Sequence, residues 1–232
     1  MSNILDTVVP SDINYSNKSA RMPVILCLEN LEPRYVRLIL NEVNHLLNKI
    51  AVSPRLRLGT EIAVIQYGDE VDVVRSLSQV SSNVTLTLSQ KKQSDSPRLG
   101  ECLNEAIKQI KLRMHNYKAV GVKNYPVSII LFSSGKCSCD TMLNDALESI
   151  NKLKLQGTVN FIPFSVTDDC SELKTASSNG ELYLLKDSDK YIDKIFDTIG
   201  KSMESLSTSS DKAYSSITDA YISWKDLDKA RR

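Results

Sequence analysis

Pro23-Val24-Ile25-Leu26-Cys27-Leu28 leads without a break into Glu29-Asn30-Leu31-Glu32-Pro33, and the segment Arg34–Ala51 follows. The first stretch is continuously apolar, which is typical of a strand covered on both faces of a sheet. Arg34–Ala51 carries one apolar stripe at helical spacing, and Pro33 suits the first turn, where backbone N–H groups have no partner within the helix. The stretch therefore predicts a buried strand, a short loop and an amphipathic helix.

The same alternation of strand and helix patterns continues along the chain. Strands are predicted at Val24–Leu28, Glu61–Tyr67, Asp72–Arg75, Val127–Phe132, Val159–Phe164 and Leu182–Leu185, with Val84–Leu88 as a further candidate. Helices are predicted at Arg34–Ala51, Leu99–Tyr117, Thr141–Leu155 and Lys190–Leu206. Strands that alternate with helices form parallel sheets through right-handed crossovers. The loop 68–71 is too short for a crossover, so the strands on either side of it must form an antiparallel hairpin. The sequence predicts an α/β fold, a doubly wound and mostly parallel sheet with one antiparallel edge strand and helices on both faces.

Composition describes an ordinary globular protein. The 232 residues are 41% hydrophobic and 25% charged, and the net charge of +1 gives no reason to expect nucleic acid or an anionic membrane as partner. The start of the chain lacks the pattern of a secretory signal, and no apolar run approaches the roughly 20 residues of a membrane helix. The five cysteines are an odd number, and Cys27 lies in a predicted strand, which favours a reducing cytoplasmic compartment. We expect a flexible arm over 1–20, one domain over 21–207, and a linker with an amphipathic helix over 208–232.

The order of these elements resembles a von Willebrand factor A (VWA) domain, in particular the bacterial proteins found with tellurium-resistance and related stress operons. The segments that carry the resemblance are Arg21–Leu28, Ile62–Tyr67, Leu99–Leu103 and Val127–Gly135. The resemblance implies a cytoplasmic, non-enzymatic protein-interaction module in a stress-response or defence-type assembly. It also implies a protein partner such as a Ser/Thr kinase, a phosphatase or another protein encoded in the same operon.

VWA domains normally carry Asp-x-Ser-x-Ser after the first strand, where it holds a divalent cation. Here the aspartate position is Glu29, and the two serine positions are Leu31 and Pro33. Leu31 and Pro33 have no side-chain oxygen, whereas Mg²⁺ requires near-octahedral oxygen ligation. This first ligand loop has therefore lost two of its three ligands.

The other two ligand loops of the family have changed as well. The threonine position falls on Pro97, beside Ser96, and the aspartate position after the fourth strand falls on Ser134. We therefore expect no metal ligand, no bound cation and no cofactor. The alternative is a remnant site formed by Glu29, Glu32, Ser96 and Ser134.

A bridging cation works by accepting a carboxylate from the partner, so its loss predicts recognition by shape and hydrogen bonds. We call the loops that enter the helices at the carboxyl ends of the parallel strands the strand-end rim, because ligands of open α/β sheets bind there. The rim residues predicted to contact the partner are Glu29, Asn30, Glu32, Ser96, Ser133, Ser134 and Lys136.

Cysteines on the same loops suggest an alternative function, a metal or redox sensor. Cys137 and Cys139 follow one predicted strand, Cys170 follows the next, and Cys102 near a helix start is a further candidate ligand. Thiolates bind Zn²⁺, but Cys-x-Cys without a nearby histidine is weak evidence for a zinc site. We therefore expect Cys137, Cys139 and Cys170 to be free thiols.

Catalytic patterns are missing from the sequence. Ser134-Gly135-Lys136 lacks the remaining residues of a phosphate loop, and no Gly-x-Ser-x-Gly occurs. His45 and His115 lie inside predicted helices, where surface positions are expected. The pair Asp168-Asp169 is expected to cap the helix that follows it. The chain is therefore predicted not to be an enzyme.

The last residues suggest a docking element. Tyr214, Ile217, Tyr221, Trp224 and Leu227 recur every three or four residues, which places them on one face of a helix. Aromatic anchors dominate such interfaces, so Tyr214, Tyr221 and Trp224 are predicted to bind a partner or a second copy of the chain. The alternative is a last helix that folds back on its own domain.

Overall fold

The structure is a computed structural model that describes residues 17, 19–80, 84–89, 91–136, 141–185 and 189–208. Six strands form one sheet in the order β3-β2-β1-β4-β5-β6. They are β1 (Met22–Glu29), β2 (Thr60–Tyr67), β3 (Val71–Gln79), β4 (Val127–Ser133), β5 (Val159–Ser165) and β6 (Tyr183–Leu184). Every neighbouring pair is parallel except β2 and β3. The predicted fold class is therefore confirmed, and β3 is the antiparallel edge strand.

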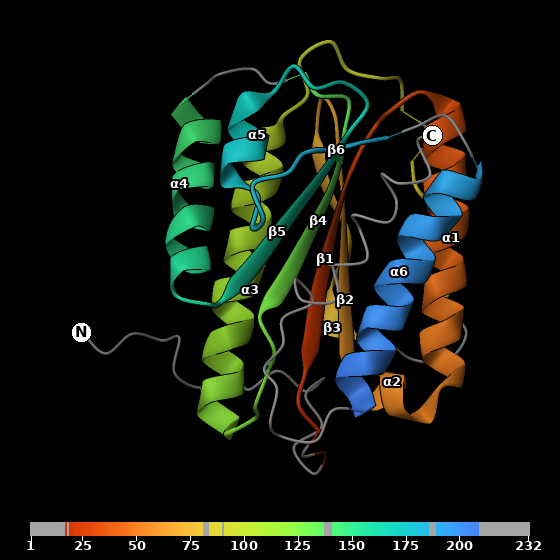
Figure 1. The fold of residues 1–232 in the computed structure, drawn as a ribbon, viewed down its shortest axis with the longest axis vertical. Helices are drawn as coiled ribbons and strands as arrows, with labels where there is room; N and C mark the ends of the chain where they lie inside the picture. Colours follow the sequence, from red (N-terminus) through yellow and green to blue (C-terminus); the bar gives the residue numbers. More distant parts are fainter. Residues whose placement is uncertain are drawn as a thin grey trace.

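Helices cover both faces of this sheet (Figure 1). The helices are α1 (Pro33–Val52), α2 (Pro54–Gly59), α3 (Leu99–Val120), α4 (Thr141–Leu155), α5 (Ser171–Ala176) and α6 (Asp189–Thr208). Helices α1, α2 and α6 contribute to one apolar cluster, and α3, α4 and α5 contribute to the other. The four predicted helices are confirmed within a few residues. Helices α2 and α5 have six residues each, too few for a helical period to appear in the sequence.

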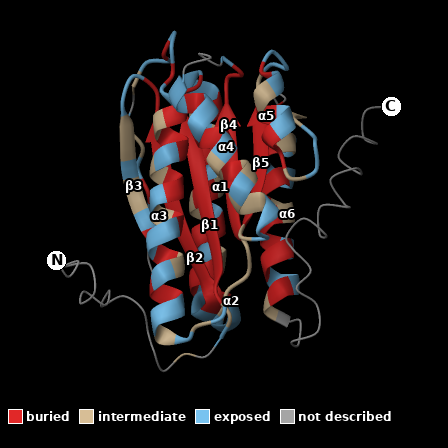
Figure 2. Ribbon diagram, turned by 90° about the vertical axis from the view of Figure 1, so that its left-hand side faces the viewer, coloured by how far each residue is buried: buried red, intermediate tan, exposed pale blue. Residues whose placement is uncertain are grey.

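The central strands lie between these two helical layers. Every residue of β1, β2, β4 and β5 is buried, whereas β3 is mostly half-exposed (Figure 2). Burial on both faces explains why the central strands are continuous apolar runs.

The segment Val84–Leu88 was predicted as a candidate strand, and this prediction is wrong. The side-chain amide of Asn44 on α1 makes two hydrogen bonds with the backbone of Leu86. It accepts from the N–H at 2.7 Å and donates to the carbonyl at 3.1 Å. Side-chain amides of this kind offer the backbone an alternative to a strand ladder.

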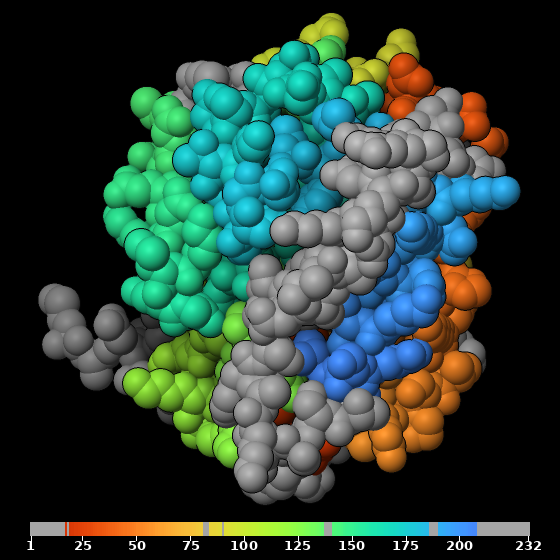
Figure 3. All heavy atoms as spheres, viewed as in Figure 1, coloured from red at the N-terminus to blue at the C-terminus, as the bar shows by residue number. Residues whose placement is uncertain are grey.

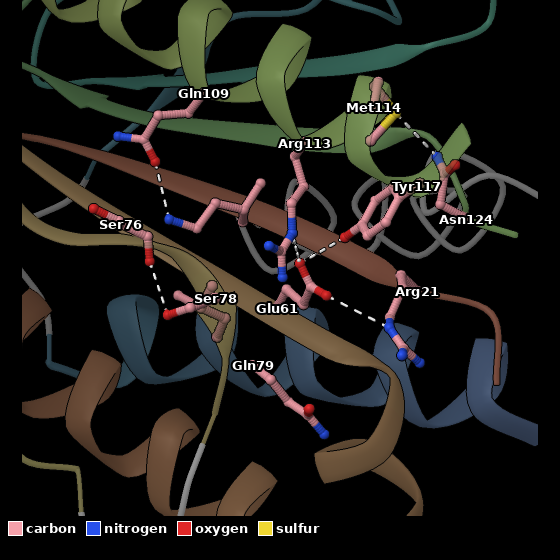
Figure 4. Close-up of polar contacts among 12 residues, drawn as sticks. Arg21, Glu61, Ser76, Ser78, Gln79, Gln109, Arg113, Met114, Tyr117 and Asn124 are labelled. Atoms are coloured by element: carbon pink, nitrogen blue, oxygen red, sulfur yellow. Dashed lines mark hydrogen bonds and ion pairs between the residues drawn. The ribbon is translucent and has the colours of Figure 1, made fainter. Parts of the chain in front are cut away.

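A buried ionic cluster fixes the end of the sheet where the parallel strands begin (Figure 4). Glu61, in β2, accepts hydrogen bonds at 2.6 Å from both Arg113 Nε and Tyr117 OH of α3. Its other oxygen lies 3.5 Å from Arg21 Nε, just before β1. All four side chains are buried, with Arg21 and Glu61 only 1% exposed. One carboxylate thereby joins the starts of two strands to a helix.

Burial and charge shift the pKa values of the cluster in directions that keep it intact. Burial raises the pKa of Tyr117, and the negative charge of Glu61 raises it further, so the phenol stays a proton donor. Burial alone would lower the pKa of Arg113, but the hydrogen bond and charge of Glu61 outweigh it and the pKa rises. The guanidinium therefore stays charged.

We expect Glu61→Ala to lower the free energy of unfolding by about 3–5 kcal/mol, because it leaves two buried guanidinium groups without their anion. The matched control is Glu105→Ala, which removes the exposed ion pair with Lys108 (3.0 Å). The control should cost less than about 1 kcal/mol. Urea denaturation of both variants measures the difference, and equal losses would show that the cluster contributes no special stability.

Candidate functional site

The strand-end rim lies at the opposite end of the molecule. In the space-filling view, segments far apart in the sequence meet at the top, in orange-red, yellow and cyan (Figure 3). Strand register sets the contacts there: Glu29 is paired with Tyr67 of β2, and Ser133 of β4 is paired with Ser165 of β5. The pairing of Leu28 with Phe132 puts Glu29 beside Ser133. A polar row therefore crosses the carboxyl ends of four adjacent strands.

Glu29 is the centre of this row. Its Oε2 accepts hydrogen bonds from Tyr67 OH (3.2 Å), Ser133 Oγ (3.0 Å) and Ser134 N–H (2.8 Å). Its Oε1 is buried and has no hydrogen-bond partner in the described part of the chain, and the whole side chain is 3% exposed. Burial and, next, the charge of Glu29 raise the pKa of Tyr67, so its hydroxyl remains a donor. One carboxylate oxygen thus binds β1, β2 and β4 together through neutral donors.

The residues after Glu29 are drawn inward. Leu31 is 1% exposed and packs in the apolar cluster beneath α1. The buried Asn30 accepts a hydrogen bond from Gln66 Nε2 at 2.6 Å. A Cβ at position 68 would lie 2.4 Å from Asn30 Nδ2, so Gly68 is required for this contact. The first two residues of the loop after β1, Asn30 and Leu31, are therefore buried, and Asn30 is held by β2.

The segment before α3 is tied to the same place. The Gln66 amide also bonds both backbone groups of Ser89, at 2.7 and 3.0 Å. The buried Ser94 donates to Asp69 Oδ1 at 2.5 Å, and Arg98 N–H donates to the carbonyl of Gly68 at 2.9 Å. Loops that are distant in sequence consequently form one continuous surface.

The predicted contact residues separate into a floor and a surface. Glu29, Asn30, Ser133 and Ser134 are buried and form the floor. Glu32, Ser96 and Lys136 are exposed, and Lys136 Nζ lies 3.6 Å from a carboxylate oxygen of Asp95. The other three predicted contact residues, Tyr214, Tyr221 and Trp224, lie outside the described residues.

Two further buried residues, Gln66 and Tyr67, are hydrogen-bonded to this floor and were not predicted from the sequence. Both lie at the end of β2, and only the register of β1 against β2 places them beside Asn30 and Glu29. A polar pair at the end of an otherwise apolar strand is the signal that was available.

The cysteines do not behave as predicted. Cys27 and Cys102 are buried free thiols. Burial raises the pKa of Cys102, and a hydrogen bond with Cys27 raises it further. Because its side chain is fully buried, Cys102 belongs to the core and not to the rim.

Cys170 is disulfide-bonded, with a partner outside the described residues, so the prediction of a free thiol is wrong for this residue. Cys137 and Cys139 lie outside the described residues.

The candidate catalytic groups are dispersed. His45 and His115 are exposed on α1 and α3, as predicted. The pair Asp168-Asp169 is exposed as well, and the capping prediction is wrong because the N-cap of α5 is Cys170, without a side-chain hydrogen bond. Within the described ranges, no three His, Cys, Asp or Glu side chains are grouped to hold a metal ion. None of the described helices is long and apolar enough to cross a membrane.

Comparison with known proteins identifies the architecture. A family model of the von Willebrand factor type A domain matches residues 29–198. No curated protein matches the sequence.

Solved structures show the same fold at low identity. A von Willebrand factor type A protein from Catenulispora acidiphila has a TM-score of 0.55 at 11% identity, over 80% of this chain and 43% of that one. The ArnB paralog VWA2 from Sulfolobus acidocaldarius has a TM-score of 0.53 at 14% identity, and the match covers 80% of this chain and 46% of that one. Proximal thread matrix protein 1 from the mussel byssus, solved with zinc in its MIDAS motif (metal-ion-dependent adhesion site), has a TM-score of 0.50 at 15% identity. The match covers 80% of this chain and 48% of that one. The chain spans less than half the length of each of these three proteins.

We expect Glu29→Ala to lower the free energy of unfolding by about 2–3 kcal/mol, because buried donors from β2 and β4 lose their acceptor. Glu32→Ala is the matched control: the same substitution three residues away, at an exposed side chain, should change stability by less than about 0.5 kcal/mol. Urea denaturation compares the two variants. An unchanged midpoint for Glu29→Ala would show that its hydrogen bonds do not hold the strand ends.

Proposed function

Because this chain belongs to the von Willebrand factor type A domain family, we propose that it is a non-catalytic protein-interaction module whose strand-end rim binds a partner without a divalent cation. The observation that carries the proposal is the state of Glu29. One of its two carboxylate oxygens, Oε2, already accepts hydrogen bonds from three protein donors, Tyr67 OH, Ser133 Oγ and Ser134 N–H.

The donor set around Glu29 does not fit a divalent cation. Leu31 is packed in the core, Pro33 begins α1 and Pro97 is buried, and none of these side chains has an oxygen. A hard cation requires about six oxygen ligands at short distances. The residues at the family's ligand positions offer it one carboxylate, Glu29, whose Oε2 is already hydrogen-bonded. The mussel protein with a zinc-occupied MIDAS motif shares the fold, so the difference lies in the loops and not in the scaffold.

The cellular setting is proposed from the family resemblance. We place the protein in the cytoplasm, in a bacterial stress-response or defence-type assembly related to tellurium resistance. Its partner would be a Ser/Thr kinase, a phosphatase or another protein from the same operon, and neither nucleic acid nor membrane. The rim would bind this partner through its exposed residues, with the floor as their support.

A cysteine-based metal or redox sensor is the second candidate function. The disulfide of Cys170, the N-cap of α5 in the loop after β5, favours the redox form of this alternative because a disulfide can be reduced and re-formed. Intact mass with and without dithiothreitol, together with elemental analysis of protein purified without chelator, distinguishes a redox site from a zinc site.

The proposed function predicts a contact at the rim that does not need metal. A photo-crosslinking amino acid at the exposed Ser96 should form an adduct with a protein in cells, and the adduct should persist in EDTA. The control position is Leu112, 58% exposed on α3, which should form none. Loss of the Ser96 adduct in EDTA would refute a cation-independent interface.

Thermal melts give a second readout of the same prediction. Curves with and without millimolar Mg²⁺ should superimpose, since a ligand of the native state raises stability by mass action. A saturable rise in melting temperature that Glu29→Ala abolishes would establish a cation site.

The residues 211–232 are predicted to mediate association, because an isolated helix of about 20 residues is marginal in water and its aromatic face needs a surface. Truncation at Ser210 should leave the melting temperature almost unchanged while partner binding or self-association falls. Trp224→Ala should reproduce most of this loss. If truncation unfolds the domain, the segment is part of the core and the docking prediction fails.

A further inference from the structure

We infer that the strand-end rim selects a cationic partner segment, one that presents lysine or arginine side chains. This inference rests on the proposed function and specifies the chemistry of its partner. It reverses the charge of the ligand that a cation-bearing rim takes, because a bound divalent cation attracts a carboxylate.

The first observation is the uncompensated charge at the centre. Glu29 is 3% exposed, and the three groups that bind its Oε2 are neutral hydroxyl and amide donors. Its Oε1 is a buried acceptor without a donor in the described residues. The contrast with Glu61 is direct, since that carboxylate lies against two guanidinium groups. A buried carboxylate without a cationic partner leaves a negative potential at the rim, which a lysine or arginine side chain of the partner would neutralise without touching Oε1.

The second observation is the surrounding charge. Four exposed carboxylates on the rim and on the adjacent β2–β3 turn make no ion pair with any described residue: Glu32, Asp69, Asp168 and Asp169. Lys92, a cation of the segment before α3, is exposed and likewise unpaired among the described residues.

The remaining cations of these loops are already engaged. Lys91 Nζ lies 2.8 Å from Glu70 and 2.6 Å from Asp72, so two carboxylates share one ammonium. Arg98 is paired with Glu101 at 3.2 Å, and Lys136 lies 3.6 Å from Asp95. The balance of unpaired charge over the described rim is therefore negative, although the whole chain has a net charge of +1.

Physical consequences follow from the position of these charges. Exposed carboxylates are screened beyond about 8–10 Å at physiological salt, so their main effect is on encounter rate and partner choice. A buried carboxylate is screened much less, which gives Glu29 a larger share of the local field. An anionic partner would meet like charge at the centre and at the edge of the rim.

The test uses two labelled probes, hexalysine and hexaglutamate, with fluorescence anisotropy on the full chain. Hexalysine should bind and hexaglutamate should not, and the binding should weaken between low salt and ~0.3 M salt. Asp168→Asn/Asp169→Asn should raise the Kd for hexalysine about fivefold. Glu29→Gln, which keeps the shape of the side chain and removes its charge, should also weaken binding.

The matched control removes the same charge elsewhere. Glu148→Gln/Asp197→Asn neutralises two carboxylates on α4 and α6 that are paired with Lys152 and Lys201. It should change the Kd for hexalysine less than about twofold. Equal losses in the two double variants would overturn the inference, because they would show a response to net charge alone.

The Ser96 adduct separates failure of this inference from failure of the proposed function. Excess hexalysine should suppress the adduct, and excess hexaglutamate should not. An EDTA-resistant adduct that hexaglutamate suppresses would overturn the cationic partner and leave the interaction module intact. An adduct that disappears in EDTA would overturn the proposed function itself.

Discussion

The hydrogen bonds to Glu29 Oε2 are the interaction on which the candidate site depends. They bring together a hydroxyl from β2, a hydroxyl from β4 and the first backbone N–H of the loop after β4. The protein's own donors thus hold these strand ends together, and the carboxylate is part of the scaffold. Leu31, two residues after Glu29, packs in the apolar cluster beneath α1.

Each end of the sheet contains a buried glutamate, and the two differ in whether a cation neutralises the carboxylate. Glu61 is balanced by Arg21 and Arg113, so its negative charge is more than compensated within the fold. Within the described part of the chain, Glu29 meets only neutral donors, and its Oε1 has no hydrogen-bond partner. Buried charges are costly unless they are paired, so the unpaired one is the better candidate for a group that an external partner completes.

The fold was predictable because its determinants are local or periodic. Apolar runs such as Val127–Phe132 mark strands with two covered faces, and the short loop 68–71 permits only a hairpin. The failures arose where a side chain replaced a regular element, as Asn44 does at Leu86. They also arose where a helix was too short to show a period, as in Pro54–Gly59.

The site was less predictable because it is built by register. The sequence places Glu29 and Ser133 at strand ends, but only the strand register shows that Tyr67 donates to Glu29 and that Gln66 donates to Asn30. The register of β1 against β2 and β4 brings the hydroxyl donors of Tyr67 and Ser133 to the Glu29 carboxylate. Which donors a residue at a strand end meets is therefore decided by the neighbouring strands, and the residue's own segment of sequence does not contain that information.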